Sequence, residues 1–234
     1  MTGSNSKQIL DDIVTIVQIL VGLMEAREWY QLEDLALTQP KTFKAVSRAI
    51  GLRKEFNGMS LLHACVRFDP PIHILKRMIK LHPNAVMAED CLGRTPLHVA
   101  AGSSANYEVI EILTAQYPEA CDIQDVDGKT PLHFACDTSF ELFEDENQPA
   151  RGPPCLATIS VLLKASMAAA TLEDLDEMNA LEYAILSDAS LDVVLLLQKA
   201  SQHFMKKAAF HFPTPTISAS RRGAMSRITV ALSA

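Results

Sequence analysis

Apolar positions recur at helical spacing in four segments of this chain, and each of these segments follows a shorter one. The longer apolar segments are 72–81, 109–116, 159–165 and 191–199. The shorter segments contain small residues, such as Ala100 and Ala135, where a neighbouring helix must approach closely. Helix pairs of this size cannot bury their apolar faces alone and must stack on their neighbours. The pattern therefore predicts an all-α solenoid of stacked helix-turn-helix pairs.

Each short helix is predicted to begin at a side chain that can cap its free amide groups. The capping residues are Ser60, Thr95, Thr130 and Asn179. Serine, threonine and asparagine are all favoured at this position. Pro96 and Pro131 then occupy the first helical position, where proline has a suitable φ and needs no amide partner.

The capped segments repeat with a fixed period. Residues 93–100 read GRTPLHVA, residues 128–135 read GKTPLHFA and residues 58–65 read GMSLLHAC. The steps from Ser60 to Thr95 and from Thr95 to Thr130 are both 35 residues. Asn179 follows after 49 residues, so the third repeat carries an insertion. We place the insertion at 139–155, an acidic, proline-rich segment without periodicity, which is typical of an exposed loop.

These segments resemble the ankyrin-repeat family, whose signature is Thr-Pro-Leu-His-x-Ala. Residues 95–100 and 130–135 carry the whole signature. The resemblance implies an ankyrin-repeat domain over 25–200, with about four repeats. We expect a degenerate N-terminal cap at 25–54, and repeats that begin near 55, 90, 125 and 174. Outside the domain we expect an amphipathic helix within 1–24 and a basic, Ser/Thr-rich, disordered tail at 201–234.

The motif histidines His63, His98 and His133 invite a metal or catalytic interpretation. However, one residue per repeat places them about 8–10 Å apart, whereas zinc ligands lie about 2.0–2.3 Å from the metal. The resemblance implies instead that each histidine forms local hydrogen bonds and joins neighbouring loops. The chain also lacks a Gly-rich phosphate loop, a His-Glu-x-x-His motif and a Gly-x-Ser-x-Gly motif. We therefore expect no enzyme, no metal and no cofactor.

The resemblance also implies a partner-binding surface, because turn tips and first-helix positions of ankyrin repeats form a concave groove. The turn positions of the groove correspond to Phe56, Met59, Leu92, Arg94, Val126 and Lys129, with Leu175 in the last repeat. The helix positions correspond to Arg67, Phe68, Val99, Phe134, Asp137 and Tyr183. Apolar residues among a few charges are typical of a binding core with a polar rim. Alternatively, single members of this set pack on the N-terminal helix or on the acidic loop.

Charge is unevenly distributed along the chain. The 21 Lys+Arg and 28 Asp+Glu give a net charge of −7. Residues 201–234 hold five basic and no acidic residues, so this tail is +5 and the remainder is −12. An acidic body is a poor general binder of nucleic acid, and we expect no such partner. The tail itself could contact acidic lipid weakly.

The five cysteines form no Cys-x-x-Cys pair and are odd in number, as expected for free thiols in a reducing compartment. The apolar run at 13–24 is shorter than the roughly 20 residues that span a bilayer, and two aspartates precede it where a signal peptide has basic residues. We expect an intracellular, cytoplasmic protein without a transmembrane segment, and leave a nuclear location open.

Two functions follow from these observations. The first is a non-enzymatic adaptor that binds a segment of a protein or peptide partner in the concave groove. The alternative is a membrane-peripheral or self-inhibited regulator that works through its N-terminal helix and basic tail.

Overall fold

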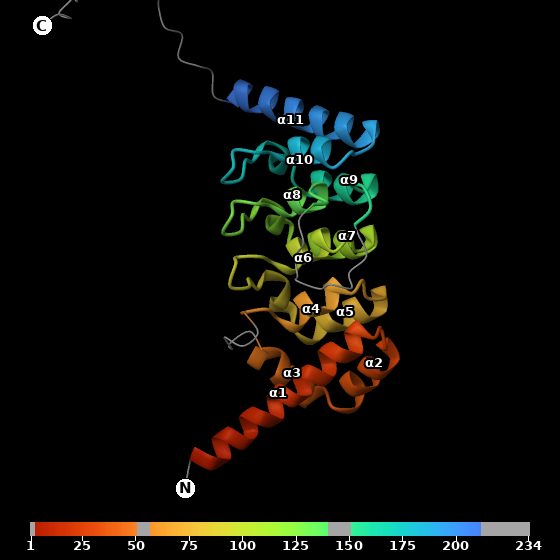
Figure 1. The fold of residues 1–234 in the computed structure, drawn as a ribbon, viewed down its shortest axis with the longest axis vertical. Helices are drawn as coiled ribbons and strands as arrows, with labels where there is room; N and C mark the ends of the chain where they lie inside the picture. Colours follow the sequence, from red (N-terminus) through yellow and green to blue (C-terminus); the bar gives the residue numbers. More distant parts are fainter. Residues whose placement is uncertain (1–2, 51–56, 140–150, 212–234) are drawn as a thin grey trace, which may run out of the picture.

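Stacked helix pairs make up most of the computed structural model, which describes residues 3–50, 57–139 and 151–211. The pairs lie one above another along the long axis of the molecule (Figure 1). They are α4 (Leu61–Arg67) with α5 (Ile72–Leu81), α6 (Pro96–Gly102) with α7 (Tyr107–Gln116), α8 (Pro131–Cys136) with α9 (Leu156–Ala165), and α10 (Ala180–Leu186) with α11 (Leu191–His211). The predicted all-α solenoid is confirmed.

Short 3₁₀ helices follow the second helices of the first three pairs. They are η2 (Pro83–Met87), η3 (Pro118–Asp122) and η4 (Ala168–Thr171). Each one leads the chain into a loop that ends at the next capping residue.

Helices of the same kind contact each other from pair to pair. α6 contacts both α4 and α8, while α7 contacts both α5 and α9. Ala100, Ala135 and Cys136 are buried where the first helices meet, so small side chains permit the close approach. Each large apolar side chain that is buried contributes roughly 1.5–3 kcal/mol, and the core runs through the whole stack.

Three helices cover the N-terminal end of the stack: α1 (Gly3–Glu25), α2 (Trp29–Thr38) and α3 (Pro40–Ile50). α1 contacts α2, α3 and α4, and it buries Val17, Leu20 and Met24. These three residues belong to the apolar run at 13–24, so this run packs on the protein. In the described ranges, no helix is long and apolar enough to cross a membrane.

The last helix extends further than the sequence analysis expects. α11 continues to His211, so the predicted domain boundary at residue 200 lies inside this helix. Val193, Leu197 and Ala200 are buried, and α11 contacts α9 and η4. Residues 201–211, the first part of the expected disordered tail, are thus helical. The rest of that tail is residues 212–234, and most of the expected acidic loop is residues 140–150. Both ranges lie outside the described residues.

Every first helix begins with the predicted cap. Thr95 and His98 form a reciprocal capping box, in which the Thr95 hydroxyl accepts from the His98 amide and His98 Nδ1 accepts from the Thr95 amide. The same arrangement joins Thr130 to His133, and Ser60 to His63. These contacts satisfy amide groups that a helix start leaves without a partner.

The other nitrogen of each motif histidine reaches the next repeat. His63 Nε2 lies 2.9 Å from the carbonyl oxygen of Arg94, and His133 Nε2 lies 3.1 Å from that of Met178. His98 Nε2 lies 3.2 Å from the carbonyl oxygen of Lys129. Because Nδ1 accepts a hydrogen bond, the neutral ring carries its proton on Nε2 and donates it to this carbonyl. Each imidazole therefore joins two repeats, as the resemblance implies.

Burial keeps these rings neutral. It lowers the pKa of His98 to about 3, and it lowers the pKa values of His63 and His133 as well. A neutral ring suits this position, because a protonated Nδ1 would lose its bond to the capping amide. The three histidines thus bind protons far more readily in the unfolded chain than in the folded one.

Stability should therefore fall in mildly acidic solution. A histidine whose pKa is lowered on folding stabilises the protein fully above the unfolded pKa of about 6.5, and this contribution is lost as the pH falls below it. We expect the free energy of unfolding to drop by about 1.4 kcal/mol per pH unit between about pH 6 and 5 through His98, and to drop further through His63 and His133. Urea titrations at a series of pH values measure this slope.

The matched variant is His98→Gln, which removes one titrating ring. It should lower the slope by about 1.4 kcal/mol per pH unit, whatever its cost in stability at neutral pH. An unfolding free energy that stays constant from pH 7 to pH 5 would contradict this account of the histidines.

Candidate partner-binding surface

Loops between successive helix pairs project from one edge of the stack (Figure 1). These finger loops comprise residues 88–94, 123–129 and 172–178. A buried aspartate closes each of them. Asp90 Oδ1 accepts from the amides of Leu92 and Arg94, both at 2.9 Å. Asp125 and Asp174 do the same in their loops at 2.8 to 3.0 Å, so the finger loops are held in one shape.

Neighbouring finger loops are joined through their backbones. The amide of Val126 donates to the carbonyl oxygen of Leu92 at 2.9 Å. The amide of Leu175 donates to that of Asp127 at the same distance. The finger loops thus form a continuous edge, along which residues of successive repeats lie next to each other.

At Gly128, a glycine is required by backbone conformation and by space. Gly128 has φ +78°, and a Cβ atom there would lie 3.0 Å from backbone atoms of Asp174 and Leu175. Glu177 occupies the equivalent turn in the last finger loop with φ +60°. Among the described residues no further finger loop packs on that turn, which explains why a side chain fits there.

Three exposed apolar side chains line the edge formed by the finger loops. The exposed fractions are 38% for Leu92, 54% for Val126 and 74% for Leu175. We call these three residues the apolar ladder. Leu175 follows the closing aspartate of its loop directly, just as Val126 does, and so extends the surface into the last repeat.

The first repeat adds partly exposed residues to the candidate surface. Met59, Arg67 and Phe68 are neither buried nor fully exposed. The Arg67 guanidinium lies 5.2 Å from the centre of the Phe68 ring, a cation–π distance. Phe56, which was also expected in the groove, lies outside the described residues.

The structure corrects the prediction that Val99 and Phe134 face the groove, because both are 0% exposed. The residue after the motif histidine packs toward the preceding repeat. Phe134 meets the ring of His98 edge-on with ring centres 5.6 Å apart. Tyr183 meets His133 in the same way at 5.9 Å and is also buried. These side chains hold repeats together and are not available to a partner.

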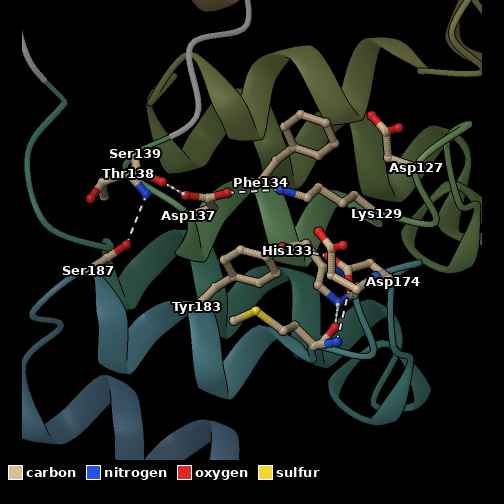
Figure 2. Close-up of polar contacts among 12 residues, drawn as sticks. Asp127, Lys129, His133, Phe134, Asp137, Thr138, Ser139, Asp174, Tyr183 and Ser187 are labelled. Carbon is tan, nitrogen blue, oxygen red and sulfur yellow. Dashed lines mark hydrogen bonds and ion pairs between the residues drawn. The ribbon is translucent and has the colours of Figure 1, made fainter.

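Two charged residues that were expected in the groove, Arg94 and Lys129, form contacts within the protein instead. Arg94 is buried, and its Nε lies 3.0 Å from Asp90 Oδ2 within the same finger loop. Figure 2 shows Lys129 pointing toward Asp137, with Nζ 3.0 Å from Oδ2. Lys129 Nζ also lies 4.4 Å from the centre of the Tyr183 ring. The contact between Lys129 and Tyr183 connects the third repeat to the fourth.

The Lys129–Asp137 pair is held in its charged form. Burial alone would raise the pKa of Asp137, but hydrogen bonds from Ser139 and Lys129 outweigh it, and the pKa is lowered. Burial alone would lower the pKa of Lys129, but Asp137 and Tyr183 outweigh it, and the pKa is raised. Tyr183 in turn donates to Asp174 Oδ2 at 2.5 Å.

Arg151 has a structural role that sequence reasoning missed. Its guanidinium donates to the carbonyl oxygens of Asp137 at 2.6 Å, Phe134 at 2.9 Å and Ala101 at 3.2 Å. It thereby satisfies carbonyl groups at the ends of α6 and α8, which a helix end leaves open. These partners lie 14 to 50 residues away in the sequence, and no local motif marks them.

Comparison with known families agrees with this geometry. Residues 62–145 match the family model described as ankyrin repeats, in three copies. The chain therefore contains ankyrin repeats over residues 62–145. Ankyrin repeats are in general protein–protein interaction modules, and the family has a non-catalytic fold. A comparison with curated proteins gave no match.

Replacing Glu177 by glycine should stabilise the protein. A residue other than glycine at positive φ carries strain of roughly 1 kcal/mol, so Glu177→Gly should raise the free energy of unfolding by about 0.5–1 kcal/mol. Gly128→Ala should lower it by at least about 2 kcal/mol, because the added Cβ would also clash with the next finger loop. Urea unfolding at neutral pH measures both changes. A destabilised Glu177→Gly variant would contradict the strain argument.

Removing one partner of the Lys129–Asp137 pair should be costly. Asp137→Asn leaves a largely buried ammonium group without its counter-ion, and we expect a loss of about 2–3 kcal/mol in unfolding free energy. Lys129→Met keeps the contact with Tyr183 but not the charge. The double variant should lose at least about 1 kcal/mol less than the sum of the two single losses. Additive losses would show that the two side chains are not coupled.

Proposed function

We propose that this protein is a non-enzymatic adaptor that binds an extended segment of a partner protein along its finger loops. The apolar ladder is the observation that carries the proposal. Leu92, Val126 and Leu175 come from three successive finger loops, and all are substantially exposed. Exposed apolar residues in a row across three repeats have no role in the core of this protein.

The rigidity of the finger loops favours specific binding. Each loop is closed by a buried aspartate, and neighbouring loops share backbone hydrogen bonds. A surface that is ordered before binding loses little conformational entropy when a partner docks. The ladder therefore presents its side chains in a fixed arrangement.

The spacing of the repeats suits an extended partner. Packed helices lie about 8–10 Å apart, and an extended chain advances about 3.3 Å per residue. A partner segment that runs along the finger loops would pass one loop about every three residues. Its apolar side chains could then contact the ladder while its backbone stays near the loop edges.

Residues of the first repeat extend the proposed surface. Met59, Arg67 and Phe68 are partly exposed, and Arg67 offers a cation beside an aromatic ring. Lys129, Asp137 and Tyr183 support the surface from inside rather than contacting the partner. Arg94 has the same supporting role in its finger loop.

The proposal is tested by polar substitution of the apolar ladder. Leu92→Ser, Val126→Ser and Leu175→Ser in one chain should weaken partner binding at least tenfold, since each buried apolar side chain at an interface contributes on the order of 1 kcal/mol or more. Partners are captured with the wild-type chain, identified by mass spectrometry, and titrated against each variant by calorimetry.

The matched control is a chain with Tyr107→Ser, Leu156→Ser and Met167→Ser, three apolar residues that are exposed on other elements. Circular dichroism checks that both triple variants remain helical. The control should bind each captured partner within twofold of wild type. If the ladder variant binds as tightly as the control, partners do not use the finger loops.

A further inference from the structure

The finger loops carry far more negative than positive charge. Together they hold eight acidic residues and two basic ones. Arg94 is already paired with Asp90 inside its own loop. Lys129 is paired with Asp137, which belongs to the end of the α8 segment and not to a finger loop. The edge therefore presents an excess of carboxylates beside the apolar ladder.

Several of these carboxylates are exposed next to the ladder. Asp127 and Asp176 each follow a ladder residue directly, and Glu177 lies at the last turn. All three are exposed. Figure 2 shows the Asp127 side chain well apart from the ammonium group of Lys129, which points toward Asp137. Val126 and Leu175 thus stand among negative charges, and a binding segment that combines apolar and basic side chains would match this edge.

The same chain contains a segment with this chemistry. Residues 212–234 hold three arginines, Arg221, Arg222 and Arg227, and no acidic residue. The same segment holds apolar residues before, between and after the arginines, including Ile217, Met225, Ile228, Val230 and Leu232. The complementarity therefore covers both the charge and the apolar character of the finger loops.

The end of α11 lies where such a segment would have to begin. α11 ends at His211 on the side of the stack from which the finger loops project (Figure 1). Its last described turns also carry Lys206 and Lys207, which are both exposed. Twenty-three residues at about 3.3 Å each can extend roughly 75 Å, whereas three stacked repeats span only about 20–30 Å.

We propose that residues 212–234 bind along the finger loops of their own chain and compete there with partner proteins. This proposal rests on the proposed function only because both involve the same surface, the edge of the finger loops. Arg221, Arg222 and Arg227 would meet the carboxylates of the finger loops, and the apolar residues around them would cover the ladder. An attached segment has an effective concentration in the millimolar range, so weak contacts are enough to occupy the surface. Salt would weaken the contact.

The test uses a full chain in which Arg221, Arg222 and Arg227 are each replaced by Glu. Its finger loops are unchanged, and under the proposal they are vacant. A fluorescent synthetic peptide of residues 212–234 is titrated into this chain and into the unmodified chain, and its anisotropy is recorded. The peptide should bind the charge-reversed chain at least fivefold more tightly, because the unmodified chain already occupies its own site. Raising the salt from about 50 to about 300 mM should weaken binding roughly tenfold.

A second pair of variants locates the site. Asp127→Lys, Asp176→Lys and Glu177→Lys, added to the charge-reversed chain, should weaken peptide binding at least tenfold. The matched control carries Asp34→Lys, Glu108→Lys and Glu111→Lys, three exposed acidic residues on α2 and α7. This control should bind the peptide within twofold of the charge-reversed chain.

Three results would each overturn the inference: no peptide binding to the charge-reversed chain, equal affinity for the unmodified chain, or equal weakening in the two lysine variants. Failure here is distinct from failure of the proposed function. Loss of peptide binding with retained ladder-dependent partner capture removes only the intramolecular contact. Peptide binding without ladder-dependent partner capture removes only the adaptor role.

Discussion

The whole stack depends on a buried imidazole that forms hydrogen bonds in two directions. In His98, Nδ1 accepts from the amide at the start of its own helix, and Nε2 donates to a carbonyl oxygen of the next repeat. The ring is buried between the repeats and remains neutral. A side chain with one acceptor and one donor on opposite sides of a ring can cap a helix and hold a neighbour at the same time. This is why the same residue recurs at a fixed period and why no metal is needed to explain it.

The bridging histidines also determine which surface is left for a partner. The rings of His98 and His133 take up the space beside them. Phe134 packs against the ring of His98, and Tyr183 packs against the ring of His133, each from the first helix of the next repeat. Three of the first-helix positions that the family resemblance assigns to the groove, Val99, Phe134 and Tyr183, are therefore part of the core. What remains exposed is the edge of the finger loops, which the stack holds in line. The candidate binding surface thus follows from the same contacts that stabilise the fold.

Sequence reasoning succeeds here where the determining contacts are local or periodic. The capping residues, the prolines and the histidines of each repeat could all be recognised from four to eight consecutive positions, and the helix pairs followed from them. It fails where the contact crosses the insertion. Lys129 and Tyr183 lie 54 positions apart, and Arg151 reaches back to Ala101. Neither contact leaves a pattern in the chain.

The burial of Phe134 shows a different limit. Phe134 lies at the repeat position that Val99 and Tyr183 occupy in other repeats. From the sequence alone, an aromatic residue there could belong to the core or could contact a partner protein. Only the position of the preceding histidine ring decides between them. By contrast, the exposure of Val126 and Leu175 is consistent with their place directly after the closing aspartates, where the chain turns outward.

The central claim is that the stacked repeats present the edge of the finger loops, and not their helices, to a partner. Methyl NMR of the full chain with a captured partner tests this directly, because Leu92, Val126 and Leu175 report from the finger loops and Leu156 and Leu191 report from exposed second-helix positions. The account predicts that addition of the partner shifts the methyl signals of the first three residues and leaves those of the other two in place. Shifts at Leu156 and Leu191 with unchanged finger-loop signals would contradict it.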